Sequence, residues 1–531
     1  MTNQPDAVPP VKHFGAWLAA IVLVTVALVT TTHRVFSQTA DEGWHLITGY
    51  EVLKRWDFKA DLHHPPLARV FFALPFLDSP APVGEKASDR GNELLLRNDR
   101  YTQNLGRARL GNLPFLALGI IVVALWGRHL FSPAAGLIAG LLYAALPPIL
   151  ALGGLATTDM AIAATLPLAL YALTLFLEQP SWKRALLLGL AIAAGGLSKY
   201  SFLLYFPAGA FALCLARLRI PSWRILGSLT VAFLLVWGAY GFTFGTIADA
   251  DARGPDAAEK IFSNKNLAFL PVPAPLYAMG AMEVKLHDLD GHRAFLFGKL
   301  SVKGWWYYFP LALFYKTPIP LLILGLTGFI LTIIRRRGIE VLLIALAILG
   351  VAMTGHINIG VRHVLPFYAP FVIAAAFAVV ELRRIRWLSI ALIAWLLIGT
   401  YKEHPDYLPW FNAFAGDHPE RILTDSNVDW GQDVLRLVRY ARREEIPHLT
   451  ISLNPDNAFF HRIGLPPFTL LEAWKPLHGW VAVSEFQLAQ GRGHSPELQA
   501  WVDEWFTEGK PFIRIGKSIR LYHFPEAGTA R

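Results

Sequence analysis

The sequence predicts a polytopic α-helical membrane protein of about eleven spans, with a small extracytoplasmic α/β domain at the C-terminus. Hydrophobic residues make up 54 % of the 531 residues and charged residues only 16 %, against about 25 % charged in an ordinary soluble domain. The apolar residues collect in long runs, and the 17 Trp, 34 Phe and 16 Tyr suit lipid-facing surfaces with aromatic interfaces. This composition excludes disorder and argues against a soluble multidomain enzyme. The single cysteine, Cys214, excludes an intramolecular disulfide and a cysteine metal site.

The expected spans follow from length and hydropathy, because a helix needs about 20 mostly apolar residues to cross a bilayer. Eleven segments meet this description approximately: 14–32, 110–127, 134–152, 159–177, 185–198, 201–216, 225–244, 318–334, 339–354, 364–380 and 387–401. The polar stretch 1–12 precedes the first span, and no clear cleavage site follows that span. We therefore expect a retained span and a cytoplasmic N-terminus.

Basic residues orient these spans. With the N-terminus inside, every strong basic cluster falls in a short cytoplasmic loop, as the positive-inside rule requires. The clusters lie at residues 128–129, 183–184, 217–224, 335–337 and 383–386. They account for much of the net charge of +9, so a nucleic-acid partner is not expected.

The remaining polar segments are expected on the extracytoplasmic side of the membrane. We predict a transmembrane domain over residues 1–401, with outer loops at about 33–109 and 245–317, and an α/β domain over 402–531. In the tail, 433–443 has the pattern of an amphipathic helix and 449–453 and 480–484 that of strands. Residues 512–524 alternate around Gly516-Lys517 and predict a hairpin.

The topology also brings the unusual polar residues to one membrane face. Ionisable groups at membrane depth are costly, so their convergence there predicts a functional site. The residues are Asp41, Glu42, His63, His64, Arg69, Arg107, Arg109, Asp159, Lys199, Lys316, His356, Asn358, Arg362 and His363.

Each group in this set has more than one interpretation. Asp41-Glu42 could take a proton from a hydroxyl or hold a metal, or could simply form a solvated turn or a helix cap. His63 and His64 precede two prolines and so lie in a rigid turn, where one of them could join a carboxylate in binding a metal.

Five cationic residues are expected on the outer face, where the positive-inside rule does not explain them. They suit an anionic ligand such as phosphate, although carboxylates or lipid headgroups could also pair with them. They are Arg109, Lys199, Lys316, Arg362 and His363.

The motifs resemble those of a known family. Asp41-Glu42 followed by the His-Pro-Pro-Leu-Ala-Arg element at 64–69 resembles the first luminal loop of the dolichyl-phosphate-mannose protein O-mannosyltransferases. Arg69 stands where those enzymes often have Lys. Four further elements resemble the bacterial glycosyltransferase family 39-like membrane proteins, at 158–159, 196–199, 316–318 and 360–366. The element at 425–433 resembles the start of the soluble domain in many of those proteins, and the tail does not resemble the β-trefoil of the eukaryotic enzymes.

This resemblance implies a GT-C fold and transfer of a monosaccharide from a polyprenyl-phosphate donor to an acceptor hydroxyl, with inversion. Asp41 would be the base and Glu42 its catalytic neighbour, while Arg109, Lys199, Arg362 and His363 would bind the donor phosphate. Orientation of the base or acceptor would fall to five further residues: His63, His64, Arg69, Asp159 and Lys316.

The resemblance leaves several points open. No cofactor is certain, and if a divalent metal binds, Glu42 and His64 are the expected ligands. Protein, lipid and polysaccharide acceptors all remain open. The resemblance favours a bacterial inner membrane with the tail outside. The alternative is a lipid or sugar transporter, against which the sequence shows no inverted hydropathy repeat.

Overall fold

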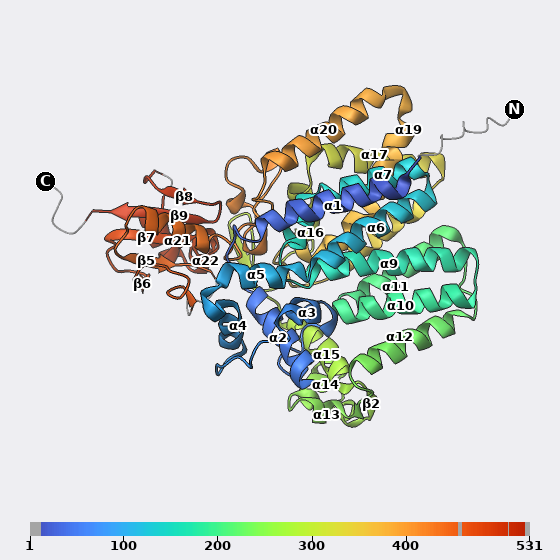
Figure 1. Ribbon diagram of the computed structural model, residues 1–531, viewed down its shortest axis with the longest axis horizontal. Coiled ribbons are helices and arrows are strands. Elements are labelled where there is room, and N and C mark those ends of the chain that lie inside the picture. Colours follow the sequence, from blue (N-terminus) through green and yellow to red (C-terminus); the bar gives the residue numbers. More distant parts are fainter. Residues whose placement is uncertain (1–11, 455–458, 508, 526–531) are drawn as a thin grey trace.

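The computed structural model describes residues 12–454, 459–507 and 509–525. The predicted polar N-terminal stretch 1–12 lies outside these residues except for Lys12. A bundle of long helices forms one side of the molecule and a small sheet domain the other, with short helices of the first outer loop near their junction (Figure 1). The predicted fold class is confirmed.

Each predicted apolar segment is helical in the structure, with bounds close to those expected. The helices are α1 (Phe14–Thr32), α6 (Leu113–Leu130), α7 (Pro133–Ala144) with α8 (Pro147–Gly153), α9 (Asp159–Glu178), α10 (Trp182–Ser198), α11 (Phe202–Arg217), α12 (Ile225–Ala239), α17 (Ile319–Arg335), α18 (Ile339–Met353), α19 (Tyr368–Glu381) and α20 (Arg386–Lys402).

Only some of these helices are long enough to cross a membrane without help from a neighbouring segment. Within the described ranges, five helical stretches are long and apolar enough to cross a membrane, and a bent pair would make six. The bent pair is α7 and α8, which meet at 66° where Pro147 and Pro148 prevent α7 from continuing. Helices α11, α12, α17 and α18 have 15–17 residues, fewer than the roughly 20 of an untilted span. The count of eleven spans therefore remains a prediction.

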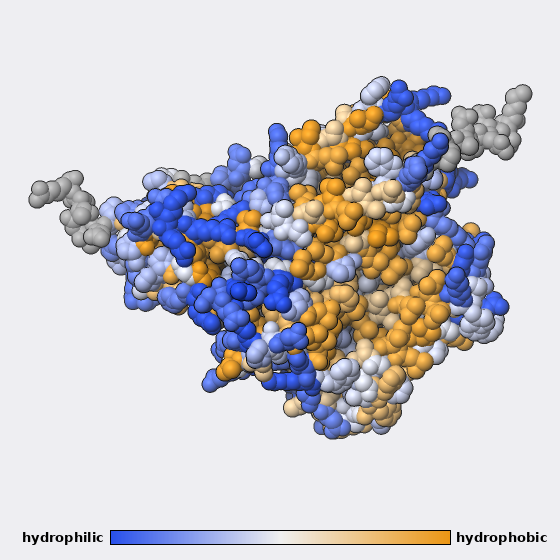
Figure 2. All heavy atoms as spheres, viewed as in Figure 1, coloured by the Kyte–Doolittle hydropathy of each residue, from blue (hydrophilic) through white to orange (hydrophobic). Residues whose placement is uncertain are grey.

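The surface of the bundle agrees with a membrane location. An apolar band covers the helices, with hydrophilic surface at both ends (Figure 2). The turn between α19 and α20 lies at the end away from the sheet domain. Arg383 and Arg384 are in this turn and Arg386 begins α20, so this basic cluster lies opposite the domain.

The first outer loop folds into α2 (Glu42–Arg55), α3 (Pro66–Ala73), α4 (Ala87–Leu96) and α5 (Tyr101–Leu110). Helices α2 and α3 approach closely at Gly49, where a Cβ would lie only 2.0 Å from the Arg69 carbonyl oxygen. This contact fixes the turn that carries His63 and His64 between the two helices.

The second outer loop contains short elements. They are the strand pair β1 (Phe244–Gly245) and β2 (Val272–Pro273), the helices α13 (Ile247–Ala250), α14 (Gly254–Phe262) and α15 (Pro275–Asp290), the hairpin β3 (Ala294–Leu296) and β4 (Lys299–Ser301), and α16 (Tyr308–Lys316).

The C-terminal domain is a five-stranded mixed sheet in the order β6-β5-β7-β9-β8. Strand β5 (Leu449–Ser452) is parallel to β6 (Phe468–Leu470) and β7 (Gly479–Ser484), while β9 (Ile519–Phe524) is antiparallel to β7 and β8 (Ile513–Ile515). Helices α21 (Val434–Arg443), α22 (Glu485–His494) and α23 (Pro496–Trp505) complete it. Trp430, Val434 and Leu437 belong to the same hydrophobic core as the bundle, so the domain packs onto the bundle.

Candidate active site

Four charged side chains from four separate elements meet at the outer ends of the bundle helices. Asp41 caps α2, Asp159 begins α9, Lys199 follows α10, and Arg362 lies on the 3-10 helix η4 (Val361–Phe367). Arg362 Nη1 lies 2.9 Å from Asp41 Oδ2 and 3.9 Å from Asp159 Oδ2. Lys199 Nζ lies 2.6 Å from Asp159 Oδ1. The predicted convergence of these four residues is therefore present.

Arg362 is held in place but has unused donor capacity. Its guanidinium carbon lies 4.1 Å from the centroid of the Trp430 ring, a cation–π contact. Its buried Nε has no hydrogen-bond partner among the residues that the structure describes. An arginine presents a planar fork of five N–H donors, so Arg362 can contact Asp41 and still donate to an anion.

Asp41 is the more accessible of the two carboxylates in this centre. Its side chain is 34 % exposed, against 1 % for Asp159. Burial is the largest influence and acts to raise the pKa of Asp41, but the charge and hydrogen bond of Arg362, together with His45 and His64, outweigh it, so the pKa lies below its ordinary value. Asp41 is therefore ionised at neutral pH and accessible to solvent.

Glu42 and Arg109 form a separate, completely buried pair. Arg109 Nε and Nη2 donate to the two Glu42 carboxylate oxygens at 2.8 Å each, and the side chains are 0 % and 1 % exposed. The other Arg109 donors bind the carbonyls of His33, Phe36 and Ser37. Arg109 therefore has no donor left for a phosphate here, and Glu42 has no free oxygen for a metal. Both residues position the loop that precedes Asp41.

The turn that carries His63 and His64 lies beside Asp41. His64 Nδ1 is 3.1 Å from Asp61 Oδ2, and the His64 ring packs edge-on against His45, with centroids 4.6 Å apart. Arg69 Nη1 lies 3.4 Å from the same Asp61 oxygen, and Arg69 also donates to the His64 carbonyl. The predicted orienting residues His64 and Arg69 are thus joined by two that the sequence did not indicate, His45 and Asp61.

Of the other predicted residues, Lys316 and His63 lie apart from the charged centre, whereas the His363 side chain is close enough to Lys199 and Asp159 to interact with their charges. The Lys316 ammonium donates to the carbonyls of Leu408 at 2.7 Å and Asn427 at 2.8 Å, which ties α16 to the C-terminal segment. His63 packs against His287, with ring centroids 5.8 Å apart. The His363 carbonyl accepts a hydrogen bond from the Tyr205 hydroxyl at 2.8 Å.

Residues 425–433 connect the loop that carries Arg362 to the loop that carries Asp41. On one side, the Ser426 hydroxyl donates to the Ile359 carbonyl at 2.6 Å, and the Val361 N–H donates to Asn427 Oδ1 at 3.1 Å. On the other side, the Ala40 N–H donates to the Trp430 carbonyl at 3.1 Å. The segment thus supports the loops that carry Arg362 and Asp41.

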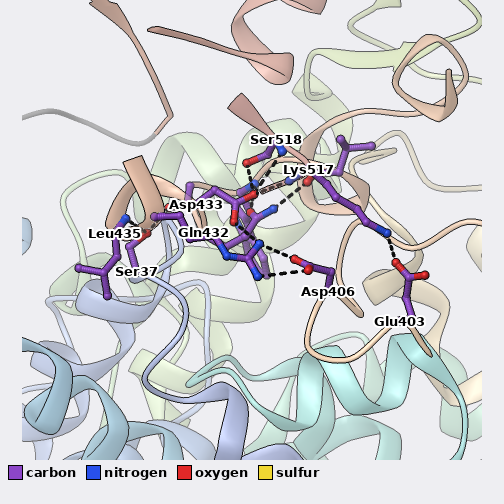
Figure 3. Close-up of polar contacts among 12 residues, drawn as sticks. Ser37, Glu403, Asp406, Gln432, Asp433, Leu435, Lys517 and Ser518 are labelled. Atoms are coloured by element: carbon purple, nitrogen blue, oxygen red, sulfur yellow. Dashed lines mark hydrogen bonds and ion pairs between the residues drawn. The ribbon is translucent and has the colours of Figure 1, made fainter. Parts of the chain in front are cut away.

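Figure 3 shows where this segment joins the sheet domain. The Ser37 hydroxyl donates to the Gly431 carbonyl at 2.8 Å. Asp433 Oδ2 accepts from the Ser518 hydroxyl at 2.8 Å and from the Lys517 N–H at 3.0 Å, and Lys517 pairs with Glu403. The sequence showed an Asp- and Asn-rich turn before a helix at this position but gave no role for it.

The helical bundle with its C-terminal domain has the fold of the GT-C glycosyltransferases. The family model described as dolichyl-phosphate-mannose-protein mannosyltransferase matches residues 103–240, a stretch that contains Arg109, Asp159 and Lys199. ArnT from Cupriavidus metallidurans in the apo state has the same fold, with a TM-score of 0.52 at 11 % identity over 96 % of this chain and 98 % of that one. The family match supports the predicted resemblance over this stretch, and the ArnT match confirms the predicted GT-C fold.

Further solved structures resemble the chain more distantly. The same ArnT bound to undecaprenyl phosphate gives a TM-score of 0.47 at 11 % identity over 95 % of this chain and 98 % of that chain. The oligosaccharyltransferase AglB from Archaeoglobus fulgidus, in complex with an inhibitory peptide and a dolichol-phosphate, gives 0.47 at 13 % identity over 93 % and 69 %. No curated protein matches the chain.

Proposed function

We propose that this protein transfers a monosaccharide from a polyprenyl-phosphate donor to an acceptor hydroxyl at the extracytoplasmic face of a bacterial inner membrane. The observation that carries the proposal is the contact of 2.9 Å between Asp41 and Arg362, a base next to a cation with a free donor. The site lies at the end of the bundle that adjoins the outer loops, where a lipid-anchored donor could present its sugar. The family match and the fold support the same chemistry.

In the proposed reaction, the acceptor hydroxyl attacks the anomeric carbon of the donor sugar and its proton passes to an Asp41 carboxylate oxygen. The new oxygen–carbon bond forms on the face opposite the phosphate, so the configuration inverts. The bond from the anomeric carbon to the phosphate oxygen breaks, and its electron pair leaves with polyprenyl phosphate. Arg362 stabilises the growing negative charge on the phosphate.

Lys199 and Asp159 complete this arrangement. The Lys199 ammonium is neutralised by Asp159 at 2.6 Å and is 13 % exposed, so it can reach a phosphate while its partner keeps it in place. Asp159 also lies 3.9 Å from Arg362, and it therefore holds both cations on one side of Asp41.

The test is transfer of labelled sugar from polyprenyl-phosphate monosaccharides by the purified protein in lipid. Asp41→Asn keeps the side-chain shape and removes the base, so we expect turnover to fall by roughly 10²–10⁴-fold. Asp78→Asn, at an exposed carboxylate of the same outer loop, is the matched control and should retain activity. Near-normal turnover of Asp41→Asn would reject the assignment of the base.

A further inference from the structure

A group of metal-ligand side chains lies in the first outer loop, apart from the residues assigned to the donor phosphate. His45 projects from α2, and Asp61 and His64 lie in the turn before α3. One potential ligand atom from each of the three lies within 4.8 Å of the other two, and no other group of this kind occurs in the described parts of the chain. The His45 and His64 rings meet edge-on at 85°.

His45 provides an independent sign that a partner is missing. The residue is 1 % exposed, and its Nδ1 has no hydrogen-bond partner among the described residues. A buried polar atom without a partner is costly, and native structures contain few of them. A metal ion bound by this nitrogen would remove the cost.

Arg69 is the competing partner for Asp61. Its Nη1 lies 3.4 Å from Asp61 Oδ2, longer than a strong charged hydrogen bond of about 2.8 Å. Arg69 also binds the backbone, donating to the carbonyls of His64 and Pro65. Asp61 Oδ1 accepts from the His63 N–H at 2.9 Å, and Oδ2 already lies 3.1 Å from His64 Nδ1. The guanidinium can therefore remain in place while Oδ2 binds an ion between the imidazoles.

We propose that His45, Asp61 and His64 bind a divalent transition-metal ion of the zinc class. Two imidazoles and one carboxylate suit zinc or cobalt, whereas magnesium and calcium prefer oxygen ligands. Tetrahedral zinc with bonds of about 2.0–2.1 Å places its ligands about 3.4 Å apart, which small side-chain rotations can provide here. Three protein ligands leave the fourth position open.

The location gives this ion an entry route and a position beside the base. The His64 side chain is 26 % exposed and Asp61 only 1 %, so the ion enters past His64. The His45 N–H donates to the Asp41 carbonyl at 2.9 Å, so the site lies one helical turn from the proposed base. The assignment of the metal does not depend on the transfer reaction.

The experiment measures metal binding directly, with the full chain in lipid and any affinity tag removed. The protein is stripped with a chelator, loaded with Zn²⁺ and dialysed, and its metal content is determined. Co²⁺ is added in parallel, because its absorption spectrum reports tetrahedral coordination. We expect one ion per chain and no comparable binding of Mg²⁺.

Variants separate this site from adventitious binding. His45→Gln and His64→Gln should weaken Zn²⁺ binding by more than the roughly 10–100-fold that loss of an outer hydrogen-bond partner costs, while His287→Gln, another imidazole of the outer loops, should bind normally. His64→Gln is the safer variant for folding because this side chain reaches the surface. Substoichiometric binding to the wild type, or unchanged binding in both ligand variants, would overturn the proposal.

Discussion

Two arginine–carboxylate pairs of similar appearance have different tasks at the scale of single residues. Arg109 and Glu42 are buried, and their side chains bond to each other and to neighbouring backbone groups. Arg362 and Asp41 are joined by one contact, with an exposed carboxylate and an unused guanidinium nitrogen. A pair whose hydrogen-bonding groups are all used stabilises the fold. A pair with an unused donor that reaches the surface can also bind a ligand.

This difference predicts that one of two carboxylate substitutions lowers stability strongly and the other hardly at all. Glu42→Gln leaves the Arg109 charge uncompensated in the interior, which should cost about 3–5 kcal/mol of unfolding free energy. Asp41→Asn lies at a partly exposed site and should change stability little while lowering turnover by roughly 10²–10⁴-fold. Denaturation of both variants in lipid, beside transfer assays, measures the contrast. Equal stability of Glu42→Gln and the wild type would refute the structural role of the pair.

Arg362→Lys tests whether the forked guanidinium is needed for donor use. Lysine keeps the charge but offers one point of contact instead of a planar fork. We expect a decrease in kcat of roughly 10²–10³-fold, comparable to the loss of one preorganised donor to a developing oxyanion. Arg107→Lys, at an exposed arginine of the first outer loop, is the control. An unchanged kcat and donor dependence would exclude a phosphate role for Arg362.

At the scale of elements, local patterns were predictable and long-range partners were not. The expected helix at 433–443 is Val434–Arg443, and the expected hairpin is β8 and β9. The three-residue strand β6 has too little pattern to predict, because it is defined by its pairing with β5. The site shows the same limit. Nothing in the sequence distinguishes Arg109 from Arg362, because their roles depend on pairing with Glu42 and Asp41 in the folded chain.

The contact between α2 and α3 is an element-scale requirement for the site. Gly49→Ala would place a methyl group 2.0 Å from the Arg69 carbonyl oxygen, so the helices must separate. We expect a loss of about 1–3 kcal/mol in stability, as for other overpacked sites, and reduced transfer because the His64 turn shifts. Gly350→Ala in α18 has no atom within 4 Å of the new methyl group and should be tolerated. Thermal unfolding in lipid and transfer rates provide the comparison, and wild-type behaviour of Gly49→Ala would contradict the close-packing argument.

At the scale of the whole molecule, the C-terminal domain is part of the site's support. Residues 425–433 contact the loops of both Asp41 and Arg362, and Asp433 and Ser37 fasten this segment to the domain and to the first outer loop (Figure 3). A Cβ at Gly516 would lie 2.2 Å from the Asp433 carboxyl carbon, so the turn of the β8–β9 hairpin fits closely against it. Movement of the domain would therefore move the charged centre.

This coupling predicts that docking of the domain depends on pH through Asp429. Its carboxylate accepts from the N–H groups of Gly431 at 3.2 Å and Phe486 at 3.0 Å, and burial raises its pKa from 3.8 to about 7, with the charge of Asp433 acting in the same direction. An acid whose pKa is raised by folding binds more protons when folded, so stability is highest below pH 3.8 with respect to this group. It then declines as the pH rises toward about 7, by about 1.4 kcal/mol per pH unit inside that window.

Above about pH 7 Asp429 is ionised in both the folded and the unfolded state. Its effect on the unfolding free energy therefore no longer changes with pH. Asp429→Asn cannot ionise, so the difference in unfolding free energy between wild type and variant should change steeply between about pH 4 and pH 7 and become flat above. Denaturation in lipid across this range, with protease cleavage of the undocked domain as a second readout, measures the difference. A variant that follows the wild-type pH profile in parallel would show that Asp429 does not titrate with docking, and the pH response of the domain would then have to come from other groups.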